Sequence, residues 1–432
     1  MEETFIPTKY RLQSQATGRI FDDTGWMLDA PGEEKPALIR AIYANKLLQL
    51  RDESMGFYRF ADWLPIRRIL KGSSAPVTYK SEGLASALGL SNLWITFSGW
   101  WPEKGVNMNT CSFKETEAYS VCGRLDPERK QVLVVASAGN TARAFAKVCS
   151  DNNIPLLLCV PHDYINALWF DAPLNDCVKL AVTAFGSDYF DAIHLSNLVT
   201  QCEGYLAEGG AKNVARRDGM GTTTLSAVTT IGRIPDYYFQ AVGSGTGAIA
   251  AWEANLRLID DGRFGDNKMK LMVSQNAPFL PIYEAWKAGS RAMLPYNDDL
   301  AREHVSEIDA KVLSNRKPPY PITGGLYDAM CDAGGDVLKA TNLEARHAKE
   351  LFFEKEGIDI YAASAIATAS LKNAVEEGLV EKDALIMLNI TGGGEELFKR
   401  SHELYFLEPS LLFGITPSLQ EVREGLDTLQ WK

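Results

Sequence analysis

The sequence lacks several features that would assign a chain of this size to a common functional class. Its 432 residues include 44 lysines and arginines against 55 aspartates and glutamates, a formal net charge of -11. Surfaces that bind nucleic acid or an anionic membrane need clustered lysine and arginine, so we expect neither partner. No apolar run is long enough to cross a bilayer. Because Met1 to Glu3 are followed by no apolar segment, we also expect no signal peptide.

Metal-ligand spacing is missing as well. The seven cysteines are scattered without a C-x-x-C pair, and the five histidines do not cluster with one another or with cysteine. We therefore predict no metal site. Most of the cysteines have apolar neighbours, as Cys149 and Cys159 do, which is typical of buried, reduced thiols. This usage predicts a cytoplasmic protein.

The chain does contain a regular alternation of strand-like and helix-like segments. Apolar runs that predict buried strands lie at 131–137, 154–161, 178–186, 270–275 and 384–394, and helical spacing follows at 140–149 and 188–206. A strand that turns into a helix is predicted over 236–258. Such alternation is typical of βαβ units and parallel sheets. We predict an α/β fold with two lobes, joined by a polar, turn-rich stretch at 209–224.

A glycine-rich loop, GSGTGA at 243–248, follows one predicted strand and opens a helix. Glycine lets the backbone approach a ligand, and N–H groups at a helix start favour an anion. A dinucleotide site would also need an acid at the end of the next strand, and 274–276 offer none. A smaller phosphate fits the loop better. A tight turn that holds nothing is the alternative interpretation.

Three further features suit a site around that phosphate. Lys114 stands in NTCSFKETEAY, Asn140 follows a strand in VVASAGNTARAFA, and Thr391 ends a strand before three glycines. A lysine amine that condenses with a carbonyl anchors pyridoxal 5′-phosphate chemistry. In such a site Asn140 would hydrogen-bond the ring's 3′-oxygen and Thr391 would face the pyridine nitrogen. The phosphate would bind Gly243, Ser244, Gly245, Thr246 and Gly247.

Each of these residues has a simpler interpretation. Lys114 could be a lysine on a surface helix, Asn140 a helix cap, and Thr391 an ordinary hydroxyl at a strand end. Three glycines after a buried strand favour close approach to a ligand instead.

The motifs SFK, SAGNT, GSGTG and TGGG, in this order, resemble fold-type II pyridoxal-phosphate enzymes, and among them the threonine synthase branch. The resemblance covers nearly the whole chain, including 9–28, which is similar to that family's N-terminal hairpin. It implies two doubly wound α/β lobes with the cofactor in the cleft between them. The implied domains are an N-terminal hairpin-like extension without zinc ligands at 1–34, a large pyridoxal-phosphate-binding domain at 35–125 with 213–432, and a small mobile domain at 126–212.

The chain departs from threonine synthases where that family surrounds its substrate. The family's S-F-K-D-R becomes SFKET at 112–116, so the arginine is missing, and G-E-G-x-T-P-L is replaced by GSSAPVTYKS at 72–81. The family's E-P-A-S-A-A becomes YAASAI, which places Tyr361 where an acid near the cofactor is usual. These changes predict the same cofactor and another substrate.

Together with the segment at 99–118, the departures resemble the cysteate synthases, relatives of threonine synthase in methanogenic archaea. That resemblance implies β-replacement of O-phospho-L-serine by sulfite, giving L-cysteate and phosphate for coenzyme M biosynthesis. It implies that Lys114 holds the cofactor and moves the Cα proton. The turn after the first strand would bind the substrate through Ser137, Gly139, Thr141 and Arg143. Lys104, Arg216 and Arg217 are further cations that could face the substrate anions.

Other functions fit the same motifs. Threonine synthase itself, or an O-phosphoserine sulfhydrylase that uses sulfide, would need the same lysine and loop. A catalytically silent relative that binds an amino acid is an alternative of another class, although such a protein does not need Lys114. We expect a homo-oligomer with small-molecule substrates.

Overall fold

Two mainly parallel β-sheets organise the chain, as predicted. The protein is described by a computed structural model, which covers residues 5–431. The larger sheet has six strands, in the order β15 (Asp336–Ala340), β14 (Lys270–Asn276), β13 (Tyr237–Ala241), β16 (Ile386–Ile390), β5 (Leu93–Phe97) and β4 (Val77–Lys80). Only β4 runs antiparallel to its neighbour. The central strands β13 and β16 are buried along their whole length and mostly apolar, because both of their faces are covered.

The smaller sheet has five parallel strands, in the order β12 (Tyr205–Ala207), β8 (Val132–Ala136), β9 (Leu156–Pro161), β11 (Val178–Thr183) and β18 (Leu411–Phe413). The last of these strands comes from the C-terminal segment, which the sequence analysis assigned to the large domain at 213–432. Its residue Phe413 shares an apolar cluster with Val132 and Leu157 of the smaller sheet. The segment therefore returns to the smaller lobe, where β18 pairs with β11 and Phe413 is buried.

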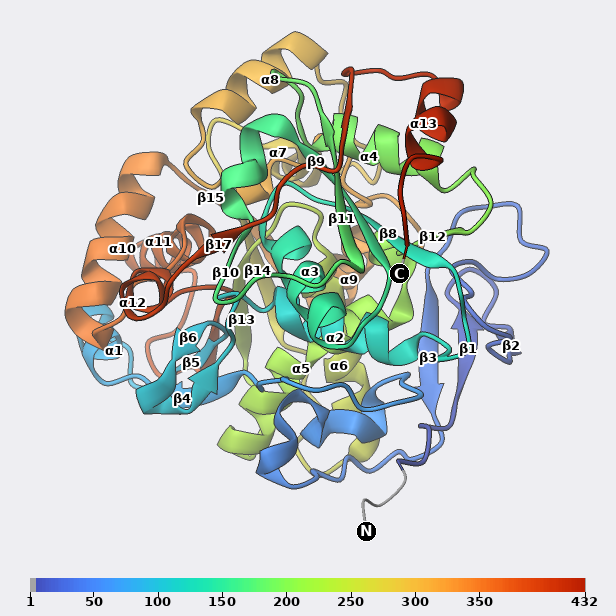
Figure 1. Ribbon diagram of the computed structural model, residues 1–432. Helices are drawn as coiled ribbons and strands as arrows, with labels where there is room; N and C mark the ends of the chain where they lie inside the picture. The colour runs from blue at the N-terminus through green and yellow to red at the C-terminus, as the bar shows by residue number, and fades with distance from the viewer. Residues whose placement is uncertain (1–4, 432) are drawn as a thin grey trace.

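Helices cover both sheets (Figure 1). They are α1 (Gly83–Leu88), α2 (Lys114–Arg124), α3 (Asn140–Asp151), α4 (Tyr189–Val199), α5 (Val214–Ile231), α6 (Thr246–Asp261), α7 (Pro281–Lys287), α8 (Asp298–Glu307), α9 (Leu326–Ala333), α10 (Asn342–Glu356), α11 (Ala362–Glu376), α12 (Glu395–Ser401) and α13 (Leu419–Leu426). In the picture, α10 and α11 lie at one edge of the molecule and the N-terminal strands at the opposite edge. Among the described residues, no helix combines the length and apolar character that a membrane span requires.

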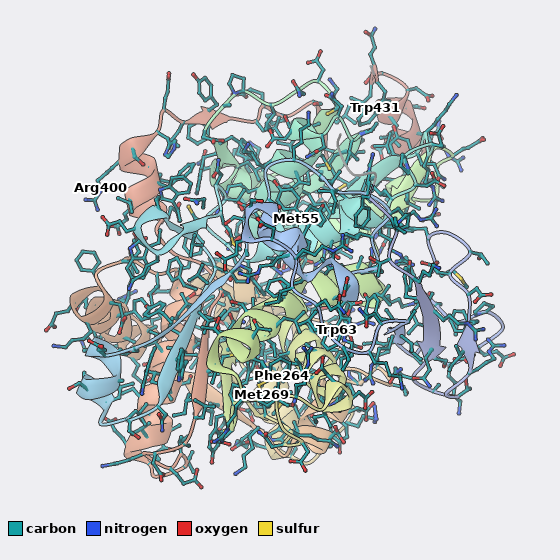
Figure 2. The ribbon with its side chains drawn as sticks, turned by 90° about the horizontal axis from the view of Figure 1, so that it is seen from below. Met55, Trp63, Phe264, Met269, Arg400 and Trp431 are labelled. Carbon is teal, nitrogen blue, oxygen red and sulfur yellow. The ribbon has the colours of Figure 1, made fainter. Side chains whose placement is uncertain are left out.

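Short elements complete the fold. They are β1 (Tyr10–Ser14), β2 (Ile20–Phe21), β3 (Ile39–Tyr43), β6 (Trp100–Trp101), β7 (Val106–Asn107), β10 (Trp169–Phe170) and β17 (Tyr405–Phe406), with 3-10 helices at Glu53–Trp63, Pro102–Lys104, His162–Ala167, Gly210–Lys212 and Lys311–Leu313. The first two strands form the N-terminal hairpin, to which β3 adds a third antiparallel strand. In Figure 2 the buried Trp63 and Met269 lie among the core side chains, whereas Arg400 lies at the periphery.

The prediction of a joining loop at 209–224 is wrong over most of that segment. Residues from Val214 onward form α5, a buried helix that Asn213 caps by accepting from the N–H of Ala215. Several of its threonines bond within the helix, for example Thr222, whose hydroxyl donates to the carbonyl of Gly219 at 2.6 Å, and Thr223, which donates to the carbonyl of Met220 at 2.9 Å. A side chain at Gly219 would collide with the carbonyl of Thr116 on α2. The glycines and threonines thus serve close helix packing, which the turn-like composition of the segment conceals.

Candidate active site

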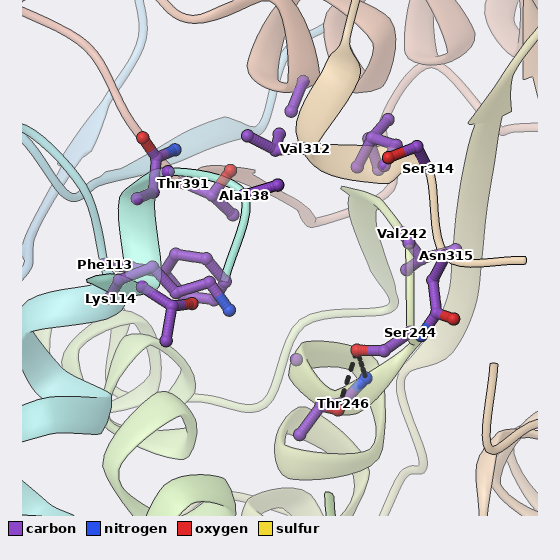
Figure 3. Close-up of a pocket in the computed structure, with 18 of the residues that line it drawn as sticks. Phe113, Lys114, Ala138, Val242, Ser244, Thr246, Val312, Ser314, Asn315 and Thr391 are labelled. Atoms are coloured by element: carbon purple, nitrogen blue, oxygen red, sulfur yellow. Dashed lines mark hydrogen bonds between the residues drawn. The ribbon is translucent and has the colours of Figure 1, made fainter. Parts of the chain in front are cut away.

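A cleft lies at the carboxyl ends of the strands, where open α/β sheets bind their ligands. Its empty volume, which includes space open to solvent, is about 920 Å³. All but one of the site residues from the sequence analysis line it: Lys114, Ser137, Gly139, Asn140, Thr141, Gly243, Ser244, Gly245, Thr246, Gly247 and Thr391. The exception is Arg143. Figure 3 shows Lys114 on one side of the cleft and Ser244 and Thr246 on the other.

Lys114 reaches the cleft because the loop before it is attached to the larger sheet. The N–H of Phe113 donates to the carbonyl of Thr391 at 2.9 Å, and Ser112 forms a β-bridge with Gly392. Cys111 takes the left-handed conformation, with φ of 55°, and so turns the chain into α2. These contacts bring the first residue of α2 to the end of β16, which lies far away in the sequence.

The charge of the Lys114 amine is governed by buried neighbours. Its Nζ lies 3.0 Å from Oε2 of Glu117, and 21% of the side chain is exposed. Burial lowers the pKa of the amine, Arg216 lowers it further, and Glu117 opposes both effects. A lowered pKa suits an amine that must act as a nucleophile or base. Glu117 was not predicted as a site residue, because nothing in its spacing separates it from an ordinary helix glutamate.

The glycine loop offers backbone donors to an anion. Gly245, with φ of 79°, precedes the first residue of α6 and has no side chain to cap it, while Ser244 Oγ accepts from the N–H of Thr246 at 3.4 Å. The other first-turn N–H groups have no acceptor inside the helix, so they can bind a phosphate. Ser244 Oγ and Thr246 Oγ1 lie 2.9 Å apart beside them. This set of donors fits the phosphate of pyridoxal 5′-phosphate.

Neighbouring side chains also require the glycines of this loop. A Cβ at Gly243 would lie 3.0 Å from Cα of Leu313, and one at Gly245 would lie 2.6 Å from Cδ2 of Leu326. Close packing and an open helix start are therefore both reasons for the glycine pattern. Leu313 belongs to the segment 311–315, which lines the cleft and was not foreseen from the sequence.

The turn before α3 is held by its own side chains. Ser137 Oγ accepts from the N–H groups of Gly139 and Ala142, both at 3.0 Å. Gly139 has φ of 146°, which favours glycine. The first-turn N–H groups of Asn140 and Thr141 remain available to a carboxylate, which fits the substrate role predicted for this turn.

Arg143 lies behind Asn140 rather than in the main cleft. It is 2% exposed, and its guanidinium donates to Oδ1 of Asn140 at 3.1 Å and to the hydroxyl of Tyr361 at 2.7 Å. It also donates to the carbonyls of Thr110 and Ala167. Because the amide oxygen of Asn140 accepts from Arg143, its NH₂ group is the part left to donate to a ligand. That donor fits the 3′-oxygen of the cofactor.

The glycine run after Thr391 packs against protein atoms. A Cβ at Gly392 would overlap the ring of Tyr361, and one at Gly394 would overlap the carbonyl of Trp100. Of residues 391–394, only Thr391 is among those that line the cleft. The hypothesis that these glycines admit a ligand is therefore wrong, and they admit Tyr361 and neighbouring backbone instead.

The other cations considered have protein partners. Lys104 lies over the rings of Tyr79 and Trp101, with 4.9 Å from Nζ to the Tyr79 centroid. Arg217 is buried and pairs with Glu253 at 3.0 Å. Arg216 does line the cleft, where it pairs with two buried glutamates.

Comparison with known proteins agrees with this geometry. The family model described as "Pyridoxal-phosphate dependent enzyme" matches residues 103–392. A cysteate synthase of Methanosarcina mazei is 49% identical over 396 residues, which are 91% of this chain and 93% of that protein. A cysteate synthase of Methanoculleus marisnigri is 46% identical over 93% of each chain.

Solved structures show the same fold at much lower identity. Maize serine racemase is 16% identical, with a TM-score of 0.56 over 76% of this chain and 91% of its own. A mutant of O-ureido-L-serine synthase with bound O-ureido-L-serine is 11% identical, with a TM-score of 0.53 over 74% of this chain and 88% of its own.

Proposed function

This chain belongs to the pyridoxal-phosphate-dependent enzymes, and from its similarity to the cysteate synthases we propose that it makes L-cysteate and phosphate from O-phospho-L-serine and sulfite. The observation that carries the proposal is identity of 43–49% to cysteate synthases over most of the chain, with Lys114 in the cleft. Its cofactor is pyridoxal 5′-phosphate.

The residues that would hold the cofactor come from the start of α2 and from three strand ends. Lys114 would bind its carbonyl carbon, the start of α6 its phosphate, and the NH₂ group of Asn140 its 3′-oxygen. Thr391 would face the ring nitrogen. When bound, the cofactor stabilises the electron pair that is left on the substrate's Cα as the proton departs.

The chain's own residues account for the rest of the proposed reaction. The neutral amine of Lys114 takes the Cα proton and becomes an ammonium group. The Cβ–O bond breaks, and its electron pair leaves with the phosphate. The lone pair on the sulfur of sulfite then forms the new Cβ–S bond, and Lys114 returns its proton to Cα. The first-turn N–H groups of Asn140 and Thr141 would keep the substrate carboxylate in place throughout.

Two anions must enter a protein whose formal net charge is -11. The starts of α3 and α6 both face the cleft, and helix starts carry partial positive charge. Lys311 adds a cationic group to the lining, whereas the charge of Arg216 is offset by Glu117 and Glu208. This local field supports substrates such as phosphoserine and sulfite despite the net charge.

Absorption spectroscopy of the purified enzyme tests the proposal, with Lys114→Ala as the control. We expect a visible cofactor band that changes when O-phosphoserine is added and returns when sulfite follows, with cysteate and phosphate formed in equal amounts. A band that ignores O-phosphoserine but responds to O-phosphohomoserine would contradict the substrate and favour threonine synthesis. A response to sulfide and not to sulfite would favour a sulfhydrylase.

We also propose that the enzyme is a cytoplasmic homo-oligomer. The buried, free thiols of Cys122 and Cys149, whose sulfur atoms lie 3.6 Å apart, support the location, because reduced cysteines are typical of the cytoplasm. Light scattering of the purified protein checks the oligomeric state, and a monomer at working concentration would contradict it.

A further inference from the structure

A cluster of buried charges lies directly beside the amine of Lys114. We define the Glu117 cluster as Lys114 and Glu117 on α2, Arg216 on α5, and Glu208 on the loop after β12. One carboxylate oxygen of Glu117 lies 3.0 Å from Nζ of Lys114, and the other lies 2.9 Å from the guanidinium of Arg216. Arg216 reaches Glu208 with two bonds, at 2.6 and 2.8 Å. Glu117 therefore bridges the amine of the lysine and a second cation.

The fold builds this cluster from packed helices. Glu117 follows Lys114 by three residues on α2, and this spacing places two side chains on the same face of a helix. Gly219 lets α5 approach α2 closely, which brings Arg216 alongside Glu117. The side chain of Glu117 is fully buried, and those of Arg216 and Glu208 are 10% and 5% exposed. Burial at this level makes each charge depend on its partners, because water cannot replace them.

The charges of the Glu117 cluster balance when the amine of Lys114 is free and protonated. The cluster then holds two cations and two carboxylates. When Nζ is joined to the cofactor, it is no longer a free ammonium group that can pair with Glu117 in this way. The carboxylate of Glu117 thus lies in position to pair with the amine of Lys114 each time this amine is released from the cofactor.

We propose that Glu117 is a positioning residue for Lys114: it binds the amine whenever Nζ is released from the cofactor, and it sets how firmly that amine holds its proton. The inference depends on the proposed function only through the role of Lys114 as cofactor anchor. In the proposed reaction, the lysine must take a proton from Cα and later return it. A carboxylate at 3.0 Å stabilises the ammonium form between these two steps.

Other groups around the amine influence it in opposite directions. Burial and Arg216 lower the pKa of Lys114, whereas Glu117 and Glu208 raise it. Tyr189 on α4 also faces the cluster and lines the cleft, and burial raises the pKa of its hydroxyl, so it stays neutral. The carboxylate of Glu117 is the group closest to Nζ. Its removal leaves burial and Arg216 to act on the amine with little opposition.

The test follows the binding of pyridoxal 5′-phosphate to the full-length apoprotein, which requires the neutral amine but neither substrate. We expect Glu117→Gln to lower the pKa of Lys114 and so increase the neutral fraction at neutral pH. The plot of association rate against pH, from about pH 6 to about pH 10, should move to lower pH by about one unit. This corresponds to about tenfold faster association near pH 7, measured by the growth of the visible band.

Glu115→Gln is the matched control. Glu115 is a buried acid on the same helix, and burial raises its pKa to about 7; it accepts from the N–H and hydroxyl of Thr110, at 2.6 and 2.9 Å, instead of contacting Lys114. Its variant should leave the pH profile where it is. If Glu117→Gln does not fold, Glu117→Asp replaces it, with a smaller shift expected in the same direction because the shorter carboxylate draws back from Nζ.

An unshifted profile in the Glu117 variants, or an equal shift in Glu115→Gln, would overturn the inference. A shift of the expected size in an enzyme that makes no cysteate would leave the inference standing and refute only the proposed substrates.

Discussion

Two turns face each other across the cleft, and they are stabilised in different ways. The turn before α3 is fixed by side chains, since Ser137 binds two of its N–H groups and Arg143 holds the amide of Asn140. The turn before α6 depends on glycine, and its one internal side-chain pair joins Ser244 to Thr246. A fixed turn can present a single donor in one orientation, whereas an open helix start can surround an anion with several. From this difference we infer that the turn before α3 orients the cofactor ring and the substrate, and that the turn before α6 binds the phosphate.

The largest effect is expected where both turns converge, at Lys114. Lys114→Ala removes the amine that holds the cofactor and moves the proton, so turnover should fall by at least about 10³-fold. Activity assays and the visible spectrum measure it together, and Lys147→Ala on α3 is a control lysine outside the cleft. Full activity in Lys114→Ala would end the assignment of both turns to one active site.

Removing the guanidinium behind Asn140 tests the fixed turn. Arg143→Gln loses charge-assisted hydrogen bonds to four neighbours. The free energy of unfolding should therefore fall by about 1.5–3 kcal/mol. Because the Asn140 amide is then free to rotate, cofactor affinity should also fall. Thermal melts and cofactor titration measure the two effects. A variant that loses substrate affinity but keeps its cofactor affinity would instead support direct substrate binding by Arg143.

The open turn has its own test in Gly245→Ala. An alanine there must adopt φ of 79° and would place Cβ 2.6 Å from Leu326. We expect a loss of stability of about 1–2 kcal/mol from the backbone alone, together with weaker cofactor binding. Gly262→Ala, at the other end of α6, has φ of 77° with no atom within 4 Å of the added carbon. That control should show the backbone cost without the loss of cofactor, and equal effects on cofactor binding would contradict the role of the α6 turn.

The smallest effect compares one serine from each turn. Ser137→Ala leaves two N–H groups without their acceptor and should cost about 1 kcal/mol of stability. Ser244→Ala loses a bond within a half-buried loop and should cost less. Chemical denaturation of both variants measures the two losses of stability. A larger loss of stability in Ser244→Ala than in Ser137→Ala would contradict the comparison between the two turns.

The sequence was most informative where chemistry depends on a short stretch of chain. The strands at 131–137 and 384–394, the glycine loop at 243–248 and the isolated Lys114 were all recognised from local pattern, and the α/β fold follows from their alternation. Local pattern failed at 214–224, where glycine and threonine resemble a loop but build the buried α5. It also failed after Thr391, where the glycines accommodate Tyr361 rather than a ligand.

Sequence by itself therefore determined the alternation of strands and helices, the cofactor family and the residues at the strand ends, because each rests on neighbouring residues or a fixed motif. Tertiary structure alone decided that β18 joins the smaller sheet, that Arg143 lies behind Asn140, and that Glu117 meets both Lys114 and Arg216. The reason is physical. Burial, hydrogen-bond partners and the pKa of the lysine depend on which segments the packed helices and sheets bring together, and no local pattern encodes those contacts.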